Sequence, residues 1–425
     1  MRNFRLIAVI AVFTFVCSAA EKQLKQGESE LYNAAVKDLG AMDFAKSIAD
    51  LNAWQQKFPD SDFKDDRSAF FVQAYAGANQ AAKALDAASD LLSKDLGQAT
   101  TIRLLYNATW AITHVASPTP SELATGEKAA NQLMNYDQPL PGVSTEKWNE
   151  ARVDMSEKAT AALLYIAMLP GIQAMAKQPP DCAAAEAAYT KALTAYPSKT
   201  VVSYELGRAL NCEAKANSEK LSPAIYEFLR AATIDPTLGN SAADPKKIQA
   251  FANTAYTNLH GSDDGLEQLK EQVKQSPLPP ADFKIKTATE IDVERGVIFE
   301  KEHPQLALWM KIKGALSDTN GVEYFDGQLK GSGVPQLAGV LVDSKPACRP
   351  KELLVAIPLP NAQPPYQPEI TLRLDKALNG KPELNLPIHW EGAPSAFARE
   401  PFMLAMDSEA GKIEGLKTVP CTVRK

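Results

Sequence analysis

The sequence predicts an α+β multidomain protein, in which a long α-solenoid precedes a small, mainly antiparallel β domain that forms a barrel or a sandwich. Residues 28–275 are rich in Ala, Leu, Lys, Glu and Gln, which favour helix. Residues 281–425 instead contain short apolar runs separated by turn residues, a pattern typical of strands. Between the two regions, the proline-rich segment 276–280 predicts a stiff, non-helical linker.

The N-terminus has the three parts of a secretory signal peptide. Arg2 and Arg5 supply a positive start, residues 6–16 are apolar, and small residues follow at 18–20. We therefore expect residues 1–20 to be removed when the chain is exported to the periplasm or cell envelope of a bacterium.

A lipid anchor on Cys17 is disfavoured. The residues before it, Thr14, Phe15 and Val16, differ from the leucine and small residues that normally precede a lipidated cysteine. No transmembrane segment is expected in the exported chain, because no later stretch combines the required length and apolarity.

The chain is mildly acidic, with 45 Lys and Arg residues against 51 Asp and Glu residues and a formal net charge of −6. It therefore offers no excess of basic side chains to replace the counterions of a nucleic acid or to bind anionic lipid. We expect no nucleic acid as a partner.

The helical region contains a repeated hairpin pattern. Small residues occur where the two helices of a hairpin nearly touch, large residues fill the gaps, and a proline ends the second helix. The clearest copy consists of Leu206, Gly207, Ala224, Phe228, Ala231 and Pro236. The preceding copy ends with Ala185, Tyr189, Ala192 and Pro197. In the clearest copy the two halves are further apart than usual, which predicts an insertion at 217–221.

These residues resemble the motif of the tetratricopeptide repeat family, in particular its exported bacterial members, over residues 28–275. The resemblance implies a right-handed solenoid of paired helices whose concave face holds a peptide or a partner helix. It implies no particular partner. Because the matched positions are structural, the resemblance transfers no functional residue to this chain.

Four of the five cysteines follow the signal peptide: Cys182, Cys212, Cys348 and Cys421. An even number in an exported chain predicts disulfide bonds, and three pairings are possible. We favour 182–212 and 348–421, because each pair then stays within one region. In the repeat arrangement, Cys182 starts a second helix and Cys212 ends the first helix of the next hairpin, at the same end of the stack. A zinc site is disfavoured, because no Cys-x-x-Cys spacing is present.

The C-terminal region predicts short strands and one helix. The strand candidates are Phe283–Lys286, Tyr324–Leu329, Leu337–Val342, Leu353–Ile357, Ile370–Leu374, Leu386–Trp390 and Phe402–Met406. The helix is expected from Pro304 to Leu316, with the proline in its first turn. Strands of this length favour a small antiparallel barrel or sandwich, and an oligonucleotide- or oligosaccharide-binding barrel is one option.

The sequence predicts no catalytic residue, no cofactor and no metal site. Its four histidines lack metal-ligand spacing, and no nucleophile elbow is present. Gly331 and Gly333 have no helix behind them, which excludes a phosphate-binding loop. An acidic cluster without the glycine of a calcium loop is interpreted as helix-capping aspartates: Asp60, Asp62, Asp65 and Asp66.

We therefore expect a non-enzymatic, exported scaffold whose solenoid binds a protein or peptide partner, while the β domain positions it or adds a second contact. The alternative is a protein that binds a small molecule or a glycan in the β domain. An apolar groove in the solenoid would favour the scaffold, whereas a pocket with converging polar groups in the β domain would favour the alternative. The sequence does not specify the partner or the oligomeric state.

Overall fold

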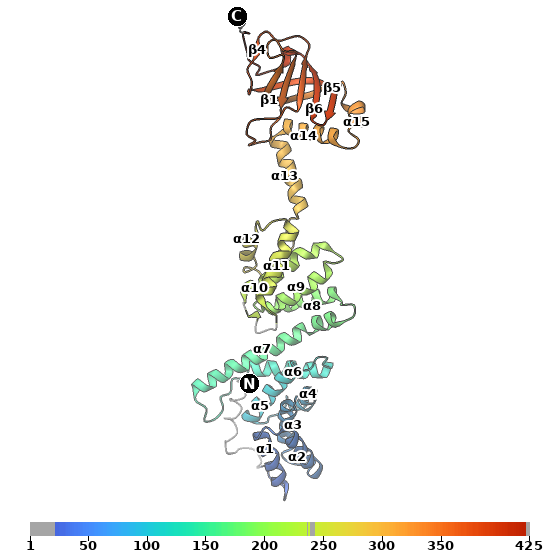
Figure 1. Ribbon diagram of the computed structural model, residues 1–425. Coiled ribbons are helices and arrows are strands. Elements are labelled where there is room, and N and C mark those ends of the chain that lie inside the picture. The colour runs from blue at the N-terminus through green and yellow to red at the C-terminus, as the bar shows by residue number, and fades with distance from the viewer. Residues whose placement is uncertain (1–21, 236, 239–242, 422–425) are drawn as a thin grey trace. The chain divides into compact units, whose positions relative to one another are not determined.

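The computed structural model describes residues 22–235, 237, 238 and 243–421 (Figure 1). The predicted signal peptide, with Cys17, and the repeat residue Pro236 lie outside the described residues. The chain divides into two compact units, Met1–Ile285 and Lys286–Lys425. The first is built from helices and the second contains the sheets, so the predicted α+β arrangement is confirmed.

The helical unit is a succession of helices joined by short connections, and each helix from α1 to α10 packs against the next one. Side-chain caps begin several of them, including a capping box of Thr119 and Glu122 at α6. The longer connection expected at 217–221 contains a 3-10 turn, η2 (Ser218–Lys220). The helices are α1 Glu28–Gly40, α2 Phe44–Lys57, α3 Lys64–Gly77, α4 Ala81–Ser89, α5 Gln98–Ile112, α6 Pro120–Met134, α7 Thr145–Ala176, α8 Cys182–Ala195, α9 Thr200–Glu213, α10 Leu221–Ile234, α11 Pro245–His260 and α12 Leu266–Gln272.

Three hydrophobic cores follow one another along this unit. The first joins α1 to α3 around Trp54, the second joins α3 to α7, and the third joins α7 to α12. The long helix α7 contributes Met155 and Ala159 to the second core and Met168 and Ala174 to the third. Among the described residues, α7 is also the one helix that is long and apolar enough to cross a membrane, by length and composition only. The expectation that no stretch after the signal peptide combines this length and apolarity is therefore wrong at α7.

Two glycines of the helical unit, Gly171 and Gly207, lie where neighbouring helices approach closely. A Cβ atom built on Gly171 would lie 2.6 Å from Cε1 of Tyr189, and one built on Gly207 would lie 3.0 Å from Cδ1 of Phe228. In both cases the glycine is on one helix of a hairpin (α7 or α9) and the ring is on the other (α8 or α10). Two consecutive hairpins therefore use the same kind of contact.

The segment expected to be a linker, residues 276–280, lies against the helical unit. The hydroxyl of Tyr226 donates a hydrogen bond to the Ser276 carbonyl oxygen at 3.0 Å, and Nε of Arg230 donates to the same oxygen at 3.2 Å. Leu278 packs against the third core. The chain thus leaves the helical unit only after this segment.

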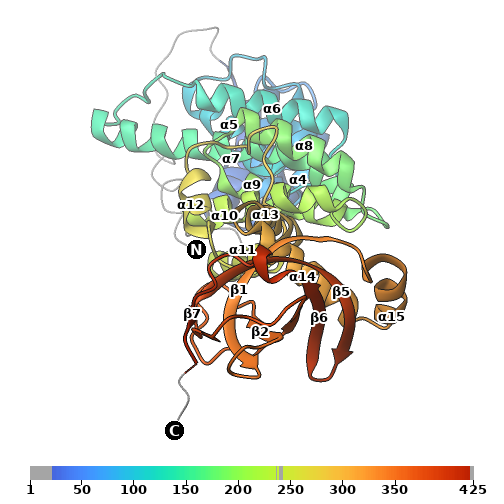
Figure 2. The same ribbon diagram turned by 90° about the horizontal axis from the view of Figure 1, so that it is seen from above.

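The second unit contains a closed barrel. Its strands follow the order β1-β2-β3-β6-β5, in which β3 and β6 are parallel and all other neighbours are antiparallel. Figure 2 shows β1, β2, β5 and β6 around the barrel. Helices α13 (Ala288–Glu302), α14 (Pro304–Ser317) and α15 (Gly321–Tyr324) precede the strands, and a π-helical turn, η4, follows α15 at Phe325–Leu329. The strands are β1 Val334–Lys345, β2 Glu352–Ala356, β3 Ile370–Leu374, β5 Pro387–Arg399 and β6 Phe402–Ser408, with β4 Lys381–Pro382 and β7 Thr418–Val419 in a separate two-stranded sheet.

Five of the expected strands overlap strands of the barrel, and α14 confirms the expected helix from Pro304 to Leu316. The strands expected at Phe283–Lys286 and Tyr324–Leu329 are wrong. In the second segment, Phe325 and Leu329 are four residues apart and both enter the barrel core, which is a helical spacing. The sequence analysis also missed α13.

The core of the barrel unit includes one helix. Trp309, Ile312 and Leu316 of α14 join the strand residues Leu353 and Trp390 in a single cluster of buried side chains. A five-stranded barrel alone has a narrow interior, so the helix adds apolar area that the strands do not supply.

The four cysteines pair in the way that the sequence favours. The Cα atoms of Cys182 and Cys212 are 5.9 Å apart, and those of Cys348 and Cys421 are also 5.9 Å apart. The first pair joins the start of α8 to the end of α9. The second joins the β1–β2 connection to the segment that follows β7. Two such pairs are consistent with an oxidising compartment.

We predict that Gly171→Ala lowers the free energy of unfolding of the helical unit by about 1–3 kcal/mol, because the added methyl group has to displace the ring of Tyr189. Gly40→Ala is the matched control, since a Cβ atom there meets nothing within 4 Å. It should change the same quantity by less than about 0.5 kcal/mol. Urea unfolding followed by circular dichroism measures both variants, and equal effects would contradict the close contact at 171.

Candidate functional site

The candidate site of the helical unit is a group of three aromatic rings, which we call the aromatic patch: Tyr204 on α9, Phe228 on α10 and Phe251 on α11. The ring centroid of Phe228 lies 6.1 Å from that of Tyr204 and 5.3 Å from that of Phe251. Phe228 is 5% exposed, whereas Phe251 is 48% exposed. The aromatic patch is therefore anchored in the core and leaves apolar ring area at Phe251 for a partner to cover.

Charged side chains accompany the aromatic patch. The guanidinium of Arg208 lies 5.9 Å from the ring centroid of Tyr204 and forms an ion pair with Glu205 at 2.8 Å. Burial raises the pKa of the Glu205 carboxyl, although Arg208 favours its ionised form. An apolar centre with charged residues beside it is the composition of a protein-binding surface.

The glycine at 207 positions the aromatic patch. Because Gly207 has no side chain, the ring of Phe228 can lie directly against α9. Tyr204 is three residues before this glycine on the same helix, so its ring meets the ring of Phe228. Phe251 then contacts Phe228 edge-on, with an interplanar angle of 85°. The contact that closes the hairpin thus also arranges the rings that remain accessible.

The residues of the repeat motif occupy structural positions. Gly207 is buried in α9. Pro197, which follows α8, uses its carbonyl oxygen to accept a hydrogen bond from Arg230 at 2.5 Å. The other described motif residues all belong to the third core: Ala185, Tyr189, Ala192, Leu206, Ala224, Phe228 and Ala231.

Helix α10 also contains a buried arginine, Arg230, and a buried glutamate, Glu227. Arg230 donates hydrogen bonds to Oγ of Ser203 at 2.7 Å and to the carbonyl oxygens of Pro197 and Ser276. It therefore connects α9, the turn before α9 and the segment that leaves the unit. Glu227 is 0% exposed, and its burial raises the pKa of the carboxyl to about 8, against the opposing effects of Ser203 and Arg230.

A second polar network is enclosed in the first core. The carboxylate of Glu28 accepts a hydrogen bond from Nε1 of Trp54 at 2.6 Å and another from the backbone N–H of Lys25 at 2.8 Å. Burial acts to raise the pKa of Glu28, but the hydrogen bonds outweigh it and the pKa is lowered. Arg67 stacks over Trp54 at 5.4 Å and donates to the carbonyl of Phe58. These groups satisfy one another, so the network is structural.

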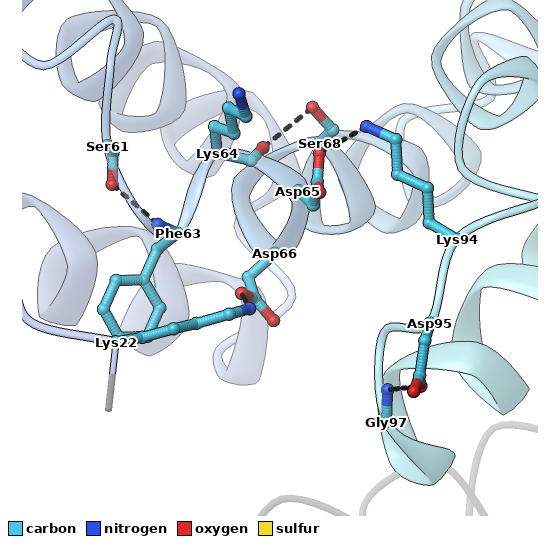
Figure 3. Close-up of polar contacts among 10 residues, drawn as sticks. All are labelled: Lys22, Ser61, Phe63, Lys64, Asp65, Asp66, Ser68, Lys94, Asp95 and Gly97. Atoms are coloured by element: carbon cyan, nitrogen blue, oxygen red, sulfur yellow. Dashed lines mark hydrogen bonds and ion pairs between the residues drawn. The ribbon is translucent and has the colours of Figure 1, made fainter. Parts of the chain in front are cut away.

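Two of the four aspartates in the acidic cluster near residue 60 form ion pairs with lysines, as Figure 3 shows. Asp65 pairs with Lys94 and Asp66 pairs with Lys22, each at 2.6 Å. The interpretation of these aspartates as helix caps is wrong, because Phe63 occupies the N-cap position of α3 and no side chain caps this helix. Asp65 and Asp66 lie instead in the first turn of α3, where a negative charge favours the helix.

Within the described ranges, no group of three His, Cys, Asp or Glu residues could hold a metal ion.

Two surface cavities lie in the described part of the barrel unit. One, of about 480 Å³, lies at the ends of β3 and β6, and six of its twelve lining residues are charged. The other, of about 600 Å³, lies between α14 and the connection from β2 to β3. Its lining is largely apolar. The charged residues around the first cavity are Arg373, Asp375, Glu391, Asp407, Glu409 and Lys412.

Sequence reasoning missed Tyr204 and Phe251 as surface residues and the cavity beside α14. A signal for Phe251 exists in α11, whose buried side is formed by Ile248, Ala252 and Tyr256 at intervals of four residues. Phe251 does not belong to this series, so a large apolar residue there is not needed for the core. No comparable signal identifies the cavity.

No protein-family model matches this chain, and no curated protein matches it. Its function is therefore inferred from geometry and chemistry.

We predict that Glu227→Gln removes a pH dependence of stability. A carboxyl with a raised folded-state pKa binds its proton more tightly when folded, so its stabilising contribution is complete below the ordinary pKa of 4.5 and is lost as the pH rises through about 8. Between about pH 5 and pH 9, the wild type should lose on the order of 2–4 kcal/mol of unfolding free energy relative to the variant.

Chemical unfolding at the two pH values measures this difference. The control is Glu219→Gln, which changes an exposed glutamate in the same hairpin and should keep the pH dependence of the wild type. Identical pH dependence in the wild type and Glu227→Gln would show that Glu227 is not the responsible group.

Proposed function

We propose that the chain is a non-enzymatic, exported protein-binding scaffold of the bacterial cell envelope, whose helical unit is a tetratricopeptide-type solenoid. The recurring contact between a glycine and an aromatic ring supports the repeat assignment. It joins Gly171 to Tyr189 in one hairpin and Gly207 to Phe228 in the next. A small residue that faces a large one across each hairpin is the packing on which this type of repeat is based.

The aromatic patch is the observation that carries the binding proposal. It combines a ring that is 48% exposed, Phe251, with the adjacent pair of Arg208 and Glu205. Tyr204 and Phe251 come from the first helices of two successive hairpins, and in a solenoid of this type the first helices line the concave face. Rings supplied by adjacent repeats suit an extended peptide or an amphipathic helix as the ligand.

Export is part of the proposal. The two cysteine pairs are at disulfide distance, and such bonds persist in oxidising compartments. A positive start, an apolar stretch and small residues at 18–20 support cleavage of a signal peptide. In this proposal the barrel unit positions the solenoid or adds a second contact.

A second candidate function is ligand binding by the barrel unit. The cavity of about 600 Å³ beside α14 favours it, because small-molecule sites commonly measure about 300–1,000 Å³. The strand order β1-β2-β3-β6-β5 also supports a Greek-key barrel of the oligonucleotide- or oligosaccharide-binding type.

We predict that a photo-crosslinking amino acid placed at Tyr204 or Phe251 captures defined envelope proteins from the native host, because a partner on the aromatic patch would lie against both positions. Mass spectrometry of the adducts identifies the partner. Phe251→Ser, combined with a crosslinker at 204, should reduce capture of the same proteins at least fivefold. The serine variant lacks the ring that the partner would bury at Phe251, and the loss of one such contact residue accounts for a change of this size.

The control position is Lys191, an exposed residue on the second helix α8, where the same crosslinker should not yield these adducts. Circular dichroism and thermal unfolding should be unchanged in Phe251→Ser, because half of this ring is already exposed. Capture that is equal at 191 and 251, or insensitive to the serine substitution, would argue against the aromatic patch as the binding surface.

A further inference from the structure

The cavity beside α14 is a groove with one helical wall and one loop wall, and we call it the α14 groove. The helical wall consists of Leu306, Trp309, Met310, Lys313, Gly314 and Ser317, which recur at intervals of three and four residues and so form one face of α14. The opposite wall is the connection between β2 and β3, from Ala356 to Glu369. This connection is rich in proline and contributes Ile357, Pro358, Leu359, Pro365 and Tyr366.

The two charged residues in the α14 groove satisfy each other. The carboxylate of Glu369 forms an ion pair with the ammonium of Lys313 and accepts a hydrogen bond from Nε1 of Trp309 at 3.0 Å. Lys313 also lies 5.5 Å from the ring centroid of Phe402. The backbone N–H of Glu369 donates to the carbonyl of Val355 at 2.9 Å, which fixes its position at the start of β3. The groove therefore has no net charge to offer a ligand.

The remaining lining is apolar and accessible. Met310 is 48% exposed on the helical wall, and Leu359 is 56% exposed on the loop wall. Behind them Trp309 is 1% exposed, because its ring extends into the barrel core. Gly314 leaves open space between the walls, since a Cβ atom built on it meets nothing within 4 Å. Apolar side chains on both sides of an open groove mark a place where apolar area is removed from water on binding.

From these observations we infer that the α14 groove binds a neutral, predominantly apolar small molecule. This inference rests on the second candidate function and specifies its ligand. A charged ligand finds no free counter-charge, because Lys313 and Glu369 are paired with each other. A glycan needs several converging polar groups, whereas the polar side chains of the groove beyond that pair are Ser317, Gln363, Gln367 and Tyr366. The Tyr366 hydroxyl already donates a hydrogen bond to the carbonyl oxygen of Ala362 at 3.3 Å.

The test uses the full-length mature protein and the neutral fluorescent probe N-phenyl-1-naphthylamine. The probe should bind to the wild type with increased fluorescence. Gly314→Phe should weaken this binding at least tenfold, because a phenyl ring placed at the open position occupies the volume of the groove. The matched control is Gly296→Phe on α13, which also adds a ring where a Cβ atom meets nothing within 4 Å but lies outside the groove. It should bind the probe like the wild type.

A second variant tests the α14 groove from its loop wall, without a substitution in α14. Leu359→Ser removes an exposed apolar side chain from the loop wall and should weaken probe binding severalfold without lowering the unfolding temperature. Absence of probe binding to the wild type overturns the inference, and so does equal affinity in the wild type, Gly314→Phe and Leu359→Ser. Binding of an anionic analogue, anilinonaphthalene sulfonate, as tight as that of the neutral probe also overturns it, because a paired Lys313 should not select an anion.

The outcome is separable from that of the solenoid proposal. Phe251→Ser alters the aromatic patch in the helical unit and should leave probe binding in the α14 groove unchanged. If Phe251→Ser abolishes the fluorescence change, the probe binds to the aromatic patch and the inference about the groove is wrong.

Discussion

The helical unit depends on how closely paired helices can approach each other. At Gly171 and Gly207 the missing side chains leave space for the rings of Tyr189 and Phe228, which fill it almost to contact with the backbone. This packing fixes the orientation of the second helix in each hairpin. It also determines what reaches the surface, because Tyr204 and Phe251 are arranged around the fixed ring of Phe228. The aromatic patch and the core of the helical unit therefore share one residue, Phe228.

Polar groups inside the same core add direction to this apolar packing. Arg230 reaches α9 through Ser203 and the chain exit through Ser276, and hydrogen bonds of this kind have preferred angles that dispersion contacts lack. The neighbouring Glu227 costs free energy to ionise in this environment. In the barrel unit, by contrast, Lys313 and Glu369 are paired at the surface, where they neutralise the charge of the α14 groove.

The features that follow from regular spacing were predictable from the sequence. Alanines and aromatic residues at repeat intervals predicted the helices α8 to α10, and the hairpin geometry predicted a contact between Cys182 and Cys212. Features that depend on tertiary partners were not predictable. Tyr324–Leu329 is rich in apolar residues that suit either a strand or a helix, and only the barrel core selects the helical form. The α14 groove joins residues more than forty positions apart, which no local pattern relates.

The strand order of the barrel has a consequence for the order in which the chain can fold. β3 ends at Leu374, but its parallel neighbour β6 begins only at Phe402. The barrel therefore cannot close until β6 is available to pair, whereas helices that pack on their immediate neighbours need only local contacts. A folding chain should thus pass through a stage in which the helical unit is formed while the barrel strands are still open. During that stage the unpaired edges of β3 and β5 are exposed to other chains.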